Sequence, residues 1–137
     1  MKNIFNFFIL FLFSQVGFSQ IVDEKQTVSS EDNKIYNSLE IDTRPEYPGG
    51  ISEFYKFLGS NFKVPSDKNF KGGKVLVFFV IEKDGTLTDV KILKDAGFNT
   101  GVEAIRILKL CEIWKPAERN GQKVRISFVI PFTLKSN

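Results

Sequence analysis

The chain contains no histidine and only one cysteine among its 137 residues. Histidine is the side chain whose ordinary pKa lies near neutral, so a general base here would have to be a carboxylate or lysine with a strongly shifted pKa. Cys111 has no partner for an internal disulfide, and its place after Leu108 in an amphipathic stretch predicts a small core residue of a helix. We therefore expect packing alone to stabilise the fold, and we do not expect an enzyme.

Other kinds of site lack their residues too. Metal binding would have to use oxygen ligands alone, and the segment DGTLTD at residues 84–89 lacks the alternating acids of a calcium loop. There is no G-x-G-x-x-G motif, and Gly72-Gly73-Lys74 predicts a bend before a strand. We predict no catalytic residue, no cofactor and no metal. Four carboxylates are candidates for a catalytic group, but turn formation and solvation in or beside a predicted hairpin explain them: Glu82, Asp84, Asp89 and Asp95.

Long hydrophobic runs are also scarce, and the one at the N-terminus has the order of a secretory signal. An apolar run from Ile4 to Phe13 follows Lys2 and leads to small residues up to Ser19. A membrane-spanning helix needs about 20 apolar residues, and Gln15 interrupts the run early. We predict residues 1–19 to be a signal peptide; the alternative is a retained N-terminal anchor.

Charge divides the rest of the chain. Residues 20–47 carry seven acids and three bases, whereas residues 48–137 carry nine acids and fifteen bases. Residues 20–44 have no sustained hydrophobic period, which predicts a flexible acidic leader, and residues 45–137 are enough for one domain. The basic body is either an ordinary solvated surface or a surface that steers an acidic partner. Its mixed charges and export argue against nucleic acid.

Hydrophobic periodicity predicts the first half of the domain. Apolar residues at helical spacing predict a helix over 51–61, which Pro65 prevents from continuing. The run VLVFFVI at 75–81 is apolar at every position and predicts a strand that is central in its sheet. Lys83-Asp84-Gly85 predicts a hairpin turn, and residues 86–94 form the partner strand.

The second half reads as a helix followed by a strand. Thr100 and Glu103 have the spacing of a capping box, which predicts the start of a second helix. Trp114 is expected to cover the core, and Asn120-Gly121 predicts a turn. The last strand alternates strictly, with one set of residues facing the core: Val124, Ile126, Phe128, Ile130, Phe132 and Leu134.

A proline near the end of the last strand predicts where that strand lies. Pro131 has no N–H, which a strand paired on both sides would use, so we place the strand at a sheet edge. The predicted fold is α+β: two helices packed on one face of a small three-stranded antiparallel sheet in the order αββαβ, with the last strand at the edge.

These motifs, in this order, resemble the C-terminal domain of the TonB family over residues 45–134. The resemblance is carried by short segments along the whole domain: Tyr47-Pro48, Gly73-Lys74-Val75, Asp84-Gly85, Glu103-Ala104, Trp114-Lys115-Pro116, Asn120-Gly121 and the final strand through Pro131. The family's transducers also have a membrane anchor and a long proline-rich spacer, and residues 20–44 do not contain such a spacer.

The resemblance implies a periplasmic protein-binding module in energy-dependent transport across the outer membrane. Its final strand is expected to accept the TonB box peptide of an outer-membrane transporter by β-strand addition. Lys123 and Arg125 are expected to favour an acidic peptide. The residues that the resemblance assigns to partner binding are Lys123, Val124, Arg125, Ile126, Ser127, Phe128 and Val129, with Tyr47 and Pro48 as weaker contacts.

Two alternatives stay open at the level of sequence. An open edge strand is also a template for a second copy, so a self-associating structural or adaptor domain of the cell envelope, as a homodimer, is the first alternative. If residues 1–19 are retained, the chain is instead an inner-membrane energy transducer with a periplasmic domain. An interaction with an inner-membrane proton-channel complex is expected only of this anchored form.

Overall fold

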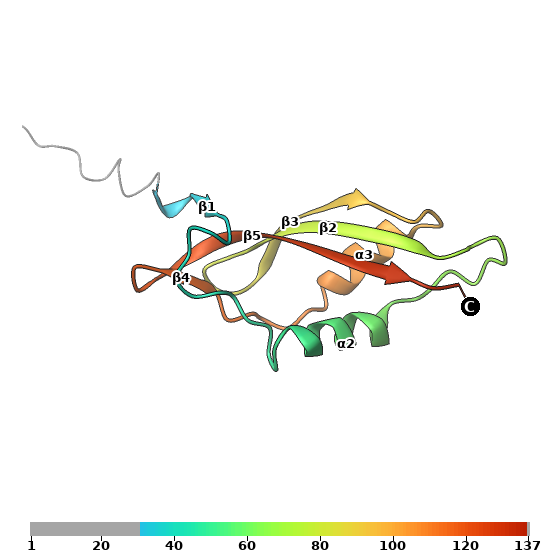
Figure 1. Ribbon diagram of the computed structural model, residues 1–137, viewed down its shortest axis with the longest axis horizontal. Helices are drawn as coiled ribbons and strands as arrows, with labels where there is room; N and C mark the ends of the chain where they lie inside the picture. Colours follow the sequence, from blue (N-terminus) through green and yellow to red (C-terminus); the bar gives the residue numbers. More distant parts are fainter. Residues whose placement is uncertain (1–30, 137) are drawn as a thin grey trace, which may run out of the picture.

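The computed structural model describes residues 31–136, which are coloured in Figure 1. The predicted signal peptide, residues 1–19, and the first part of the leader lie outside the described residues. Within residues 31–136 no helix is long and apolar enough to cross a membrane. The elements in chain order are β1 (Ile35–Tyr36), α2 (Ile51–Asn61), β2 (Gly73–Ile81), β3 (Leu87–Lys94), α3 (Thr100–Leu108), β4 (Ala117–Arg119) and β5 (Gln122–Leu134).

The sheet is mixed and has more strands than the sequence predicts. Its strand order is β1-β5-β2-β3, and β4 pairs with the start of β5. The predicted α+β class and the order αββαβ are confirmed by α2, β2, β3, α3 and β5. The prediction of three antiparallel strands is wrong, because β1 adds a parallel strand and β4 a short antiparallel one, both on β5. The predicted edge position of the last strand is also wrong where β1 pairs with Arg125 and Ile126, because β5 there lies between β1 and β2.

The apolar run of β2 is explained by its central position. It pairs with β3 on one side and with residues 126–134 of β5 on the other. Val75, Val77 and Phe79 are fully buried in the main core cluster. A strand with neighbours on both sides and a covered face has few places for polar side chains, so it is almost continuously hydrophobic.

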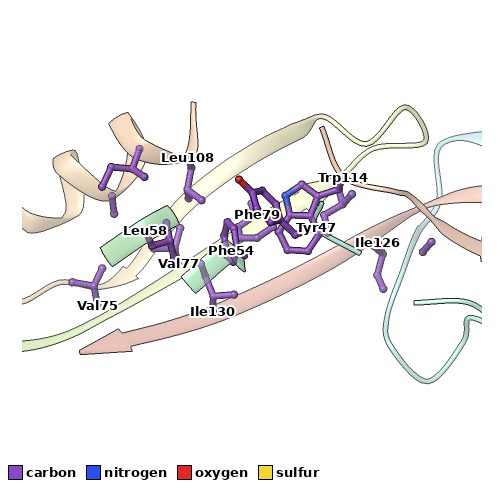
Figure 2. Packing of buried hydrophobic residues seen from close by; sticks show 14 of the residues in the cluster. Tyr47, Phe54, Leu58, Val75, Val77, Phe79, Leu108, Trp114, Ile126 and Ile130 are labelled. Atoms are coloured by element: carbon purple, nitrogen blue, oxygen red, sulfur yellow. The ribbon is translucent and has the colours of Figure 1, made fainter. Parts of the chain in front are cut away.

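Helix α2 has the predicted bounds and packs on the sheet through one stripe. It follows Gly50, whose φ of 92° is a conformation that glycine adopts without strain. Phe54 and Leu58, four residues apart, lie on one face and are buried. Figure 1 shows α2 and α3 on the same side of the sheet, and Figure 2 shows Phe54 and Leu58 among the residues of the buried cluster.

Helix α3 begins as predicted but not by the predicted capping box. Asn99 is the N-cap residue and has no side-chain cap hydrogen bond. The Thr100 hydroxyl accepts a hydrogen bond from the Ala96 N–H at 3.0 Å, upstream of the helix. Glu103 accepts one from the Lys63 N–H at 2.8 Å and so ties α3 to the loop after α2. A local bond to the preceding loop and a tertiary bond to residue 63 therefore replace the reciprocal bonds of a capping box.

The segment after α3 corrects one prediction and confirms another. Cys111 lies beyond the end of the helix at Leu108, so its predicted place in a helix is wrong, but it is half-buried and packs against the core cluster. Its sulfur accepts a hydrogen bond from Trp114 Nε1 at 3.4 Å. Trp114 is only 2% exposed, as expected of a residue that covers the core. Its ring packs on Phe54 with ring centres 4.9 Å apart.

Candidate functional site

Strand β5 shows the alternation that its sequence predicts. Val124, Ile126, Ile130 and Leu134 are buried, whereas Val129 is 49% exposed. The register against β2 pairs Ile81 with Ile126 at one end and Gly73 with Leu134 at the other. A slip by one residue would move the buried set into solvent, so the apolar pattern fixes this register.

Pro131 defines which backbone groups of β5 face away from β2. It is paired with Leu76 and has no N–H to donate, so its place in the ladder is a position that does not hydrogen-bond to β2. Its carbonyl accepts a hydrogen bond from the Tyr55 hydroxyl at 3.4 Å, on the side away from β2. Because such positions alternate along an antiparallel strand, the N–H and C=O of Arg125, Ser127 and Val129 also face outward.

The leader occupies part of this outer edge. Strand β1 pairs in parallel with β5, with Ile35 opposite Arg125 and Tyr36 opposite Ile126. The Ser127 hydroxyl donates a hydrogen bond to the Tyr36 carbonyl at 3.4 Å. Among the described residues no strand pairs with the outer edge of β5 beyond Ile126. Pairing therefore covers the start of this edge, and Val129 follows it.

Tyr36 anchors β1 to the domain. It is 3% exposed, and the Arg119 guanidinium lies 5.1 Å from the centre of its ring. A guanidinium over an aromatic face is attracted by the ring quadrupole. The Tyr36 hydroxyl donates a hydrogen bond to Glu31 at 3.0 Å. An aromatic residue in the leader thus belongs to the core cluster.

The leader continues along the other side of the β4–β5 hairpin. Thr43 forms an antiparallel bridge with Glu118 of β4, and Glu46 forms one with Lys115. The described residues 31–44 fall within the predicted flexible leader, and they pair with the domain at both β5 and β4. The boundary at residue 45 stays a prediction from composition.

Arg125 has its charge partner inside the chain. Its Nε and Nη2 donate to the two carboxylate oxygens of Glu82 at 2.7 and 2.9 Å, a bidentate arrangement. These bonds lower the pKa of the Glu82 carboxyl below its ordinary value of 4.5. Arg125 Nη1 also donates to the Asn33 carbonyl at 2.8 Å, next to β1. The guanidinium therefore holds both the end of β2 and the leader.

An apolar hollow of about 360 Å³ lies beside the start of the outer edge. Aromatic rings line much of it: Tyr47 and Trp114 pack edge to face with centres 5.4 Å apart, and Phe128 lies 5.9 Å from Trp114. Figure 2 shows Tyr47 and Trp114 together above Ile126. Tyr47 is 4% exposed, and burial raises the pKa of its hydroxyl. Its partner in the motif, Pro48, lines a separate shallow hollow.

A second hollow of about 440 Å³ lies near the end of β5. It is lined on one side by the Tyr55 and Phe62 side chains and on the other by Phe132. Phe62 and Phe132 pack edge to face with ring centres 5.4 Å apart. Phe128 and Phe132 are four residues apart on one face of the strand, so the two hollows lie about 13 Å apart along β5.

The predicted binding residues do not share one environment. Lys123 and Val124 pair with β4, and Arg125 and Ile126 are opposite β1. Ser127 contacts the Tyr36 carbonyl at the end of β1, and Phe128 and Val129 follow on the part of the edge that β1 does not cover. Sequence reasoning missed β1 itself, and the signal for it was an aliphatic and an aromatic β-former, Ile35 and Tyr36, in an otherwise polar leader.

Comparison with known proteins agrees with this fold. No curated protein matches the chain. Residues 66–135, half of the chain, match the family described as the Gram-negative bacterial TonB protein C-terminal domain. The matched range runs from the loop before β2 through β5 and contains the hairpin, α3 and the edge described above. The chain therefore belongs to the TonB C-terminal domain family.

Proposed function

We propose that this protein binds a short extended peptide along the outer edge of β5, and that the peptide is the TonB box of an outer-membrane transporter. Family membership supports a TonB-like role in energy-coupled transport across the outer membrane. Strand addition uses main-chain hydrogen bonds for affinity and pockets for alternate side chains for choice. The single observation that carries the proposal is the outward-facing backbone of Ser127 and Val129 beside an aromatic hollow.

The two hollows supply the means of selection. A guest strand beside β5 places every second side chain on the face of the sheet that carries the helices. Near Phe128 such a side chain meets the hollow lined by Tyr47 and Trp114, and near Phe132 it meets the second hollow. We expect apolar guest side chains four residues apart to enter both.

Of the two basic residues that the sequence assigns to an acidic guest, only Lys123 has an uncompensated charge among the described residues. Arg125 is already bound to Glu82, so its charge is largely compensated. Lys123 is exposed at the start of β5 and is free of any ion pair among the described residues. We expect an acidic residue of the guest to be attracted to Lys123 rather than to Arg125.

The test is a proline in the outer edge. Val129→Pro removes an outward-facing N–H and keeps the ladder to β2, as Pro131 does two residues later. We expect this variant to remain folded by circular dichroism and to lose at least tenfold in affinity for TonB box peptides of transporters from the same cell. Val129→Ala, which keeps the N–H, is the matched control. A folded proline variant that binds the peptides like the wild type would overturn the proposal.

A further inference from the structure

We infer that the segment Asn33–Tyr36 is an internal ligand of the β5 edge, which a guest strand must displace to bind. This inference rests on the proposed strand addition for the identity of the guest. It adds that the interaction surface is already occupied, in the described structure, by a peptide from the same chain. The observations that carry it are the register of β1, the position of Pro131 and the exposure of Val129.

Few backbone positions on the outer edge of β5 remain free for a guest strand. Arg125, Ser127 and Val129 face outward before Pro131, which lacks an N–H. In a parallel ladder the register that puts Tyr36 opposite Ile126 sets Tyr36 between the outward groups of Arg125 and Ser127. Val129 is then the position with both of its groups free. One free position is too little for a ladder, so a guest needs the positions that β1 holds.

Strand β1 is held on β5 in the way that a separate peptide would be. Only two of its residues are in the ladder. Ser127 and Arg125 bind the carbonyls of Tyr36 and Asn33 through their side chains, at 3.4 and 2.8 Å. The one buried side chain, Tyr36, lies against Arg119. Extended peptides bind a sheet edge in a similar way, through main-chain hydrogen bonds and side chains held in pockets.

The connection between β1 and the rest of the domain allows β1 to leave the β5 edge. A turn follows Tyr36, in which the Glu40 N–H donates to the Asn37 carbonyl at 3.1 Å. The next fixed points are Asp42 and Thr43, whose N–H groups both donate to the Glu118 carbonyl of β4, at 2.9 and 3.0 Å. Release of β1 therefore takes the Tyr36 ring out of the core cluster but leaves the pairing with Glu118 in place. Because β1 is covalently attached, its local concentration is high and a weak strand suffices to occupy the edge.

A synthetic peptide of residues 31–38 tests this inference without any transporter. The exported chain is purified as the wild type and as Tyr36→Gly, which removes the anchor of β1. We expect the labelled peptide to bind the variant at least tenfold more tightly than the wild type, because the wild-type edge is occupied. Tyr36→Phe, which keeps the ring, is the matched control and should behave like the wild type. Equal affinity for all three proteins, or no binding to Tyr36→Gly, would overturn the inference.

A second variant opens the edge through the backbone as well. Tyr36→Pro loses the ring and also the N–H that faces Arg125, so the labelled peptide should bind it at least as tightly as it binds Tyr36→Gly. A TonB box peptide is titrated into the same proteins and should gain at least tenfold in affinity when β1 is released. Equal binding of the box peptide to wild type and both variants would refute displacement and leave the proposed function standing. Failure of the box peptide to bind any of them would refute the proposed function, while the leader peptide still decides whether β1 is an internal ligand.

Discussion

At the scale of single residues, Gly85 allows the β2–β3 hairpin to pack closely against the segment after α3. Its φ is 83°, and a β-carbon there would lie 1.8 Å from the Trp114 carbonyl oxygen. The Trp114 N–H donates to the Gly85 carbonyl at 3.0 Å. The hairpin turn was predictable from Asp84-Gly85, but the contact with Trp114 was not, because it joins residues far apart in sequence.

Gly85→Ala is therefore expected to be severely destabilising. The added methyl group overlaps a backbone oxygen that cannot move without breaking the docked segment, so we expect a loss of about 3 kcal/mol or more in the free energy of unfolding. Gly121→Ala is the control, because Gly121 also has a positive φ, of 74°, with no atom within 4 Å of the added carbon. It should cost about 1 kcal/mol, from backbone strain alone. Urea denaturation of both variants measures the difference, and equal costs would contradict the contact argument.

Glu82 is expected to make stability depend on acid pH. Its pKa is lowered in the folded state, chiefly by hydrogen bonds from Arg125. A lowered folded pKa contributes stability that is present above the unfolded pKa, near 4.5, and is lost as the pH falls through the folded pKa. We expect Glu82→Gln to cost about 1 kcal/mol at neutral pH, with the difference from wild type shrinking below about pH 4.5.

Denaturation at a series of pH values checks this prediction. Glu112→Gln, at an exposed residue, is the matched control and should leave the pH profile parallel to that of the wild type. A constant difference between wild type and Glu82→Gln from neutral pH to pH 3 would show that the ion pair does not cause the dependence.

At the scale of elements, predictability follows length and periodicity. Helix α2 and strand β2 are long enough to show a period of 3.6 or a continuous apolar run, and both were predicted within two residues. Strands β1 and β4 have two and three residues, too few for any period. They form because β5 offers them an edge, and that information lies in the tertiary structure.

The candidate site was predictable in part for the same reason. Pro131 and the alternation of β5 were enough to expect an edge strand with an outward backbone row. They could not show that Ile35 and Tyr36 lie on that row, because parallel pairing of residue 35 with residue 125 leaves no local signature. The expected free charge of Arg125 also depended on a distant partner, Glu82.

At the scale of the whole molecule, the sheet edges decide whether two copies associate. An exposed edge strand is a template for pairing with its own kind, and proteins limit this with prolines and short covering segments. Here β1 covers the positions around Arg125 and Ile126, and Pro131 interrupts the row beyond Val129. Together, β1 and Pro131 leave too short a free row on β5 for edge-to-edge pairing of two copies through that strand.

We therefore expect the chain to sediment as a monomer even at high concentration, a result that would exclude the self-associating alternative. Val129→Pro provides the matched comparison, because it removes the free N–H between β1 and Pro131 while retaining the ladder to β2. If the wild type formed a dimer that Val129→Pro abolished, the edge would be the dimer interface, and the argument that β1 and Pro131 block it would be wrong. If wild type and variant both sediment as monomers, the edge stays available to a guest of another sequence, provided that the guest competes with β1. Sedimentation and peptide binding on the same two proteins thus separate the two uses of a single strand edge.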